Sequence, residues 1–186
     1  LEDEDSKLLA FLGDFVGRGM AKTHNALLLT EVAANGALLK SFGSATVIAV
    51  SELEPLVYND ALNAYLDDTA SVAWVMRPSV YGEILVLDNA NARRYAANAQ
   101  GDASNPMLLG YPVQYSAKAG ATAASAKSVF CGNWSFVGYR EAPGFTVLRD
   151  PYSLAKKGQI VLHYYFRTVY GVLQSEAIGY GAHPSA

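Results

Sequence analysis

The first 35 residues carry apolar side chains at a helical spacing. The apolar positions recur every four residues, close to the 3.6 residues of a helical turn, at Leu8, Leu12, Val16 and Met20. Acidic residues precede Ser6, which we expect to cap the helix because acids near a helix start favour the macrodipole. Asn35-Gly36 is a stop signal. The pattern therefore predicts one long helix that ends near residue 35.

Three glycines interrupt this helical pattern, at Gly13, Gly17 and Gly19. Each glycine inside a helix costs about 1 kcal/mol relative to alanine. We therefore expect this helix to be held by packing against a close neighbour.

The middle of the chain alternates between helical and extended patterns. A second helix is expected from Ser51, which forms a capping-box pattern with Glu54, to about residue 65. Residues 71–76 predict an apolar strand, and residues 79–87 a third helix. Residues 88–106 are rich in Asn, Ala, Gly and Asp and predict a loop. Residues 108–115 predict a strand that is broken around Gly110, with Pro112 at an edge or a bulge because it cannot donate to a ladder.

The last third of the chain is rich in strand patterns. Residues 116–127 are small and polar and predict a surface loop, and short strands are expected over 128–132, 135–140 and 145–149. Residues 159–173 predict a single strand more than twice the usual length of about 5–6 residues, which indicates an elongated sheet. Helices come early and strands late, so the fold class is α+β.

Composition narrows the functional classes. The chain has 186 residues, a net charge of −3 and 17% charged residues. An average soluble domain carries about 25%, so we expect part of the surface to be covered in an oligomer. The acidic balance does not suit a nucleic-acid-binding protein, and no apolar run approaches the length of a membrane span. The chain starts at Leu1 without an initiator Met, so we expect a processed or shortened product.

The sequence contains little that could carry catalysis. The phosphate-binding, zinc-protease and nucleophile-elbow motifs are missing, so we expect no catalytic, cofactor or metal site. The histidines are His24, His163 and His183, and we interpret each as a surface or hydrogen-bonded histidine. Cys131 and His163 could in principle form a nucleophile–base pair, although Cys131 follows apolar residues and is more typical of a buried thiol. The residues alone favour a structural or assembly protein, and a small hydrolase that uses Cys131 and His163 remains an alternative.

An ordered series of short signatures adds a family resemblance. The series is Trp74-Val75-Met76-Arg77-Pro78, Leu109-Gly110-Tyr111-Pro112-Val113, Phe130-Cys131-Gly132-Asn133-Trp134-Ser135, Phe145-Thr146-Val147-Leu148-Arg149-Asp150-Pro151-Tyr152, Gly158-Gln159-Ile160, Arg167 and Glu176-Ala177-Ile178. It resembles the C-terminal two-thirds of tailed-phage and prophage major capsid proteins with the Hong Kong 97-like fold. The family often has Asn or His in place of Arg77 and Asp in place of Asn133.

The resemblance implies an architecture. The first 40 residues would form the spine helix, which with long antiparallel strands at 139–168 makes an elongated P-domain. Residues 41–138 and 169–186 would form a mixed α/β A-domain. On this resemblance we expect the family's N-terminal extension and extended loop to be missing from the sequence.

The resemblance also implies a function. The protein would be a non-enzymatic coat subunit that assembles with itself into the pentamers and hexamers of an icosahedral shell around DNA. It would be located in the virion capsid after assembly in the host bacterial cytoplasm. Contact with the packaged DNA would be weak and non-specific, and scaffold, protease and portal proteins are possible further partners, with no membrane and no cofactor. Alternatives are an encapsulin-type nanocompartment shell, the small hydrolase and a DNA-binding accessory protein.

Overall fold

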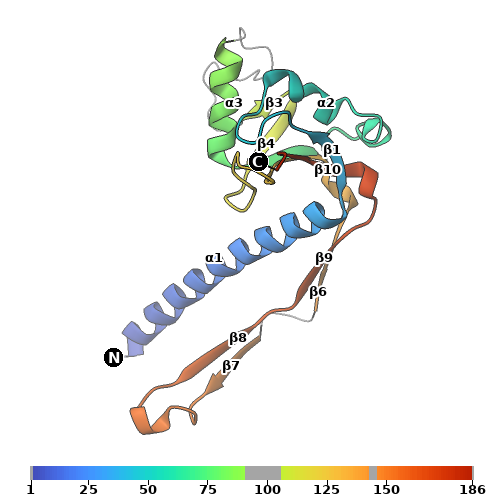
Figure 1. Ribbon diagram of the computed structural model, residues 1–186. Helices are drawn as coiled ribbons and strands as arrows, with labels where there is room; N and C mark the ends of the chain where they lie inside the picture. The colour runs from blue at the N-terminus through green and yellow to red at the C-terminus, as the bar shows by residue number, and fades with distance from the viewer. Residues whose placement is uncertain (1, 91–105, 143–145, 186) are drawn as a thin grey trace.

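The molecule consists of a body and two long elements that project from it (Figure 1). The computed structural model describes residues 2–90, 106–142 and 146–185. The helices are α1 (Glu2–Asn35), α2 (Glu54–Val57) and α3 (Pro78–Ala90), and short 3-10 turns lie at Val50–Glu52, Asn63–Tyr65, Trp134–Phe136, Ala155–Lys157 and Ser175–Ala177. The strands are β1 (Ala37–Ser41), β2 (Val72–Met76), β3 (Met107–Leu108), β4 (Tyr111–Tyr115), β5 (Lys127–Asn133), β6 (Val137–Glu141), β7 (Thr146–Asp150), β8 (Val161–Tyr165), β9 (Thr168–Val172) and β10 (Ile178–Ala182).

The body is built on a six-stranded mixed sheet. Its strand order is β1-β10-β5-β2-β4-β3, with parallel pairing at β1–β10 and β2–β4 and antiparallel pairing elsewhere. One hydrophobic cluster joins the sheet to α2 and α3 and contains Trp74, Met76, Leu56 and Ile84. A second cluster brings α1 against the sheet through Leu29, Val32, Phe130 and Ile178. The central strands are therefore covered on both sides.

The long helix confirms the prediction from the first 35 residues. α1 has 34 residues and ends at Asn35, where the Gly36 amide bonds the Val32 carbonyl at 2.8 Å. A Cβ at Gly36 would lie 2.6 Å from that carbonyl, so the chain leaves the helix where glycine is needed. The expected cap at Ser6 is wrong, because the helix already begins at Glu2.

The second expected helix is wrong. Residues 50–65 form two 3-10 turns and the four-residue α2, because Pro55 starts a new turn and Asn59 makes another. The Asn59 side chain accepts a hydrogen bond from the Ala61 amide and donates to the Leu39 carbonyl. The capping box also fails, since the residue before α2 is Leu53 and makes no side-chain cap.

The strand and helix expected between residues 71 and 87 are confirmed as β2 and α3. The strand expected over 108–115 is present as β3 and β4, which turn at Leu109 and Gly110 with positive φ angles of 51° and 85°. Pro112 lies opposite Met107 of β3, the edge strand. Of the loop expected over 88–106, residues 88–90 belong to α3 and residues 91–105 lie outside the described part of the chain.

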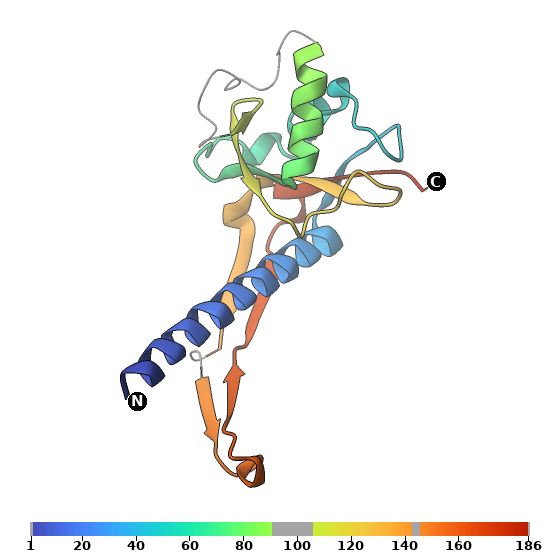
Figure 2. The ribbon, with the colours of Figure 1, turned by 90° about the vertical axis from the view of Figure 1, so that its left-hand side faces the viewer.

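The second projection is an antiparallel hairpin, called here the arm (residues 137–172). β6 pairs with β9 next to the body, and β7 pairs with β8 farther out. Figures 1 and 2 show the arm and α1 leaving the same side of the body. The single strand expected over 159–173 is wrong in detail, because Phe166 and Arg167 separate β8 from β9. The elongated shape that this strand indicated is confirmed.

The fold class is α+β, as expected, with one long helix, an extended hairpin and a mixed sheet. No helix in the described ranges is both long and apolar enough to cross a bilayer.

Candidate assembly surface

The arm exposes large apolar side chains along its length. Those exposed by about half or more are Tyr139, Val147, Leu148, Tyr152, Ile160, Tyr165 and Val169, and Tyr152 at the tip reaches 86%. No residue of β6, β7, β8 or β9 is fully buried. A two-stranded ribbon is at best marginally stable in water, since it lacks a layer to pack against. The arm therefore leaves a large part of its apolar surface open in the single chain.

The outer half of α1 is similarly uncovered. Phe11 and Phe15 lie four residues apart, on one side of the helix, and are 66% and 68% exposed. The expected close neighbour of Gly13, Gly17 and Gly19 is not provided by the described part of this chain, since a Cβ at any of the three would meet nothing within 4 Å. This side of α1 is therefore open within the part of the chain that the structure describes.

The inner faces of α1 and the arm meet at an aromatic joint. His24 Nδ1 and the Tyr170 hydroxyl share a hydrogen bond of 2.7 Å, and the His24 ring packs at 4.8 Å from the Phe166 ring. Partial burial raises the pKa of Tyr170, so its hydroxyl stays protonated at neutral pH. A cavity of about 510 Å³ adjoins the joint, between Met20 on α1 and Arg167 on the arm. This joint links the second half of α1 to the arm.

The tip of the arm is a defined turn. Asp150 accepts hydrogen bonds from the Tyr152 amide at 2.8 Å, from the Ser153 amide at 3.1 Å and from the Ser153 hydroxyl. These bonds, led by the Ser153 hydroxyl, lower the pKa of the Asp150 carboxyl. Gly158 closes the turn with a positive φ of 64°. Lys156 and Lys157 are thereby held at the far end of the arm.

The nucleophile–base pair considered from the sequence is not assembled. Cys131 lies in β5 of the body sheet, whereas His163 lies in β8 of the arm, beside Tyr165 (Figure 1). Complete burial raises the pKa of the Cys131 thiol strongly, so the thiolate that a nucleophile needs is suppressed. The Cys131–His163 hydrolase is therefore wrong.

The remaining histidine has a structural role that its place near the end of the sequence did not reveal. His183 is 4% exposed and packs on Phe42. Its Nδ1 donates to the Ser44 carbonyl at 2.9 Å, so its Nε2 can accept from the Ser128 hydroxyl, also at 2.9 Å. The chain end is thereby fastened to the body. No side-chain signal around His183 could have shown this, because its partners come from two distant segments.

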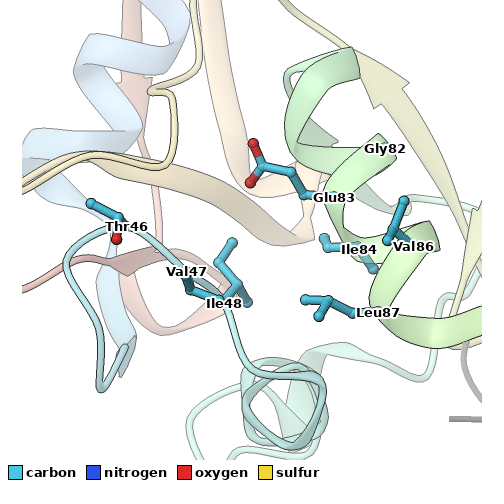
Figure 3. Close-up of a pocket in the computed structure, with 8 residues that line it drawn as sticks. All are labelled: Thr46, Val47, Ile48, Gly82, Glu83, Ile84, Val86 and Leu87. Carbon is cyan, nitrogen blue, oxygen red and sulfur yellow. The ribbon is translucent and has the colours of Figure 1, made fainter. Parts of the chain in front are cut away.

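An open apolar groove of about 460 Å³ lies on the body between Thr46–Ile48 and α3 (Figure 3). Ile48, Ile84 and Leu87 line its floor, and Glu83 stands at its rim, where it accepts a hydrogen bond from Thr122 at 3.1 Å. Among its lining residues Glu83 is the one ionisable group. A single rim carboxylate does not form a catalytic constellation. In the described ranges, no three His, Cys, Asp or Glu residues gather into a set that could hold a metal ion.

Comparison with known proteins agrees with this geometry. Residues 1–182 match the family described as the phage capsid family. No curated protein sequence matches the chain.

Solved capsid structures share its architecture. The capsid protein of the native GTA particle matches with a TM-score of 0.74 and 25% identity over 95% of this chain and 72% of that one. The capsid protein of the empty GTA particle matches with a TM-score of 0.72 and 23% identity, over 95% of this chain and 66% of that one. The mature capsid of bacteriophage PhiM1 matches with a TM-score of 0.67 and 12% identity, over 94% of this chain and 64% of that one. The chain thus spans about two thirds of the length of these capsid proteins.

An encapsulin shares the fold more distantly. The SrpI encapsulin complex from Synechococcus elongatus PCC 7942 matches with a TM-score of 0.61 and 14% identity, over 91% of this chain and 63% of that one. At this identity the likeness concerns the fold alone. The fold is therefore the Hong Kong 97-like fold that the sequence resemblance implied.

Proposed function

We propose that this chain, which belongs to the phage capsid family, builds a closed icosahedral shell by assembling with copies of itself into pentamers and hexamers. The observation that carries the proposal is the pair of projections, α1 and the arm, which leave the body with large apolar side chains exposed. It is a structural capsid protein, and the shell that it forms encloses DNA in the virion.

Burial of apolar surface between copies supplies the driving force for assembly. Phe11, Phe15, Leu148 and Tyr152 are each more than half exposed in the single chain, and covering them removes apolar area from water. Closed symmetry then limits the number of copies, because a contact between two different surfaces of identical subunits forms a ring when its rotation closes. The GTA capsids were computed with C5 symmetry, which supports a five-fold ring among the capsomers.

The two parts of the molecule correspond to two capsid domains. In this proposal residues 1–40 and 139–168 form the P-domain at the periphery of a capsomer, and residues 41–138 and 169–186 form the A-domain nearer its axis. The direction of the projections supports this division (Figure 2).

The proposal assigns no catalysis to the chain. The buried thiol of Cys131 and its separation from His163 support that assignment. The net charge of −3 supports weak, non-specific contact with packaged DNA, since DNA must be moved in and later released. Assembly takes place in the host bacterial cytoplasm, with scaffold, protease and portal proteins as further partners.

Expression of the full gene product that contains this chain in bacteria tests the proposal. Light scattering and electron microscopy are expected to show closed shells. Shells from infected or induced cells should also contain DNA that is protected from nuclease. This DNA distinguishes a virion from an encapsulin-type compartment that holds enzymes. Leu148→Ser on the arm should reduce shell yield. Val86→Ser, which changes a side chain on the body that is 69% exposed against 52% for Leu148, is the control. A discrete small oligomer from the full gene product would refute the shell.

A further inference from the structure

One side of α1 is open to solvent over its outer half. Phe11, Phe15, Arg18 and Lys22 follow one another at intervals of four, three and four residues, a spacing that keeps them on one side of a helix. All four are exposed, and they are called here the stripe. Leu29 continues the same spacing seven residues after Lys22, and it is buried against the body sheet. The side of α1 that packs on the body thus continues outward as an uncovered surface.

The arm of the same chain does not cover the stripe. The cavity at the joint with the arm is lined on the α1 side by Val16, Gly19, Met20, Thr23, His24 and Leu27. At 100° per residue, Met20 is turned by about 140° from Phe15 around the helix axis. The arm therefore lies against a different side of α1. Within the part of the chain that the structure describes, Phe11 and Phe15 remain 66% and 68% exposed.

The charges of α1 complement one another when two such helices run antiparallel. The first turn of α1 consists of four acids, Glu2, Asp3, Glu4 and Asp5. Since successive residues are 100° apart around a helix, four in a row place an acid on every side of this turn. Lys7 is the one basic residue before Arg18. Arg18 pairs with Asp14 at 2.8 Å, and Lys22 makes no ion pair within the described ranges. Antiparallel packing brings the acidic turn of one copy to the basic end of the other copy's stripe, whereas parallel packing would bring like charges together.

The position of α1 in the proposed shell suits such a pairing. The proposed division into domains puts α1 at the periphery of a capsomer, and its N-terminal end points away from the body (Figure 2). The stripe therefore lies where neighbouring capsomers meet. Copies from adjacent capsomers are related by two-fold axes of the shell, either exact or local, and a two-fold axis brings the same surface of both copies together. When this axis is perpendicular to the two helices, they run antiparallel.

We propose that the stripe of one copy packs antiparallel against the stripe of a copy in the neighbouring capsomer. Phe11 of each copy lies against Phe15 of the other, and the two-fold axis is level with Gly13. Lys22 lies nine positions after Gly13 and Glu4 nine positions before it, so Lys22 of each copy faces the acidic first turn of the other. The inference rests on the proposed self-assembly and specifies one contact between capsomers.

The size of the contact indicates when it forms. Two copies contribute four phenylalanine side chains, each about two-thirds exposed in the single chain. At about 200 Å² for each side chain, covering them removes roughly 500 Å² from water. A specific interface between free proteins buries about 1,200 Å² or more. The contact therefore does not hold two free copies together, and it forms where assembled capsomers already place two α1 helices side by side.

Disulfide trapping in assembled shells tests the register directly. Shells are assembled from an equal mixture of full gene products that carry Phe11→Cys and Phe15→Cys, and they are then oxidised. Mass spectrometry should find peptides that join position 11 of one copy to position 15 of another. Gly17→Cys in place of Phe15→Cys is the matched control, because a Cβ at Gly17 meets nothing within 4 Å and residue 17 is turned by about 200° from residue 15. The control mixture should give no such link. Links between two copies of position 11, in shells of Phe11→Cys alone, would show a parallel contact and overturn the proposal.

Removal of the aromatic side chains provides an independent test. Phe11→Ser with Phe15→Ser changes two exposed side chains, so the body should fold as before and capsomers should still form. The concentration needed for closed shells should rise at least about tenfold, because apolar burial between capsomers is lost. Sedimentation separates shells from capsomers. Val86→Ser on the body, where the side chain is 69% exposed, is the control and should leave this concentration unchanged.

The outcomes separate this contact from the proposed function. Failure of the unaltered full gene product to form shells would refute the proposed function. Shells that form but give no link between positions 11 and 15 would refute the α1 contact and leave the shell intact. Loss of capsomers as well as shells in the Phe11/Phe15 variant would place the stripe inside a capsomer and would also overturn the proposal.

Discussion

Gly179→Ala should destabilise the body strongly, because β10 runs where a side chain cannot fit. Gly179 pairs with Ala37 of β1 on one side and with Cys131 of β5 on the other. A Cβ at residue 179 would overlap the Ala37 carbonyl oxygen and lie 2.7 Å from Leu39 Cγ. The obstructing atom belongs to the backbone of a paired strand, so a change of rotamer cannot relieve the clash.

The expected magnitude follows from this geometry. Overpacking in a core costs about 1–3 kcal/mol, and a backbone obstruction places Gly179→Ala near about 3 kcal/mol. For a chain of this size that corresponds to a fall in melting temperature of about 6–12 °C. Gly171→Ala in β9 is the matched control, since a Cβ there meets nothing within 4 Å. It should change stability by less than about 1 kcal/mol and in the favourable direction.

Urea unfolding followed by tryptophan fluorescence measures both variants. Trp74 and Trp134 report on the body, where Trp74 is fully buried and donates to the Leu108 carbonyl at 2.9 Å. A lower midpoint at an unchanged slope would show a true loss of stability. Equal midpoints for Gly179→Ala and the unaltered chain would refute the parallel β1–β10 pairing.

Three further predictions concern single groups. The Cys131 thiol should resist alkylation in the folded chain, because it is buried and its pKa is raised. For the same reason the free energy of unfolding should fall as the pH rises above the ordinary pKa of 9.0, by about 1.4 kcal/mol per pH unit relative to Cys131→Ala. Urea titrations at several pH values measure this difference. Tyr170→Phe removes the hydrogen bond to His24 and should lower local stability by about 1 kcal/mol. Hydrogen exchange in the second half of α1 should then become roughly fivefold faster. Unchanged exchange would contradict a role for this joint. The pKa of Asp150 should lie below its ordinary value of 3.8, because the tip hydrogen bonds stabilise the carboxylate. The turn should therefore be intact above pH 3.8 and loosen as the carboxyl is protonated at lower pH. A titration midpoint above pH 3.8 in the amide chemical shift of Tyr152 would disprove the tip geometry.

Local sequence signals predicted the elements whose ends are set by local chemistry. α1 ends at Asn35 because Gly36 meets the Val32 carbonyl, and β2 ends where Pro78 begins α3. These boundaries depend on residues next to the boundary itself. The local pattern was sufficient there because the tertiary contacts of both elements agree with it.

The elements that the sequence did not predict depend on contacts between distant segments. β10 contains Gly179-Tyr180-Gly181, which has a low intrinsic preference for strands, yet it lies between β1 and β5 because only glycine admits the Ala37 carbonyl and the Phe42 ring. Residues 50–65 have helical spacing, but Leu53, Leu56 and Leu62 are all buried, and an irregular chain reaches the core with each of them. Tertiary packing overrides local pattern in both places.

The exposed apolar side chains of the arm indicate which surface of the chain is covered in an oligomer. The composition predicted an oligomer without indicating which surface is covered, because composition carries no position. The structure shows where apolar surface is left open, since the body has two buried clusters whereas no residue of the arm strands is fully buried. A two-stranded arm without a covering layer has little stability of its own, so its order should increase when neighbouring copies bind it. Hydrogen exchange in β7 and β8 should therefore slow markedly on assembly, while exchange in β5, already buried in the single chain, should change little. Equal slowing in both places would mean that assembly tightens the whole molecule and that the arm is not the principal contact.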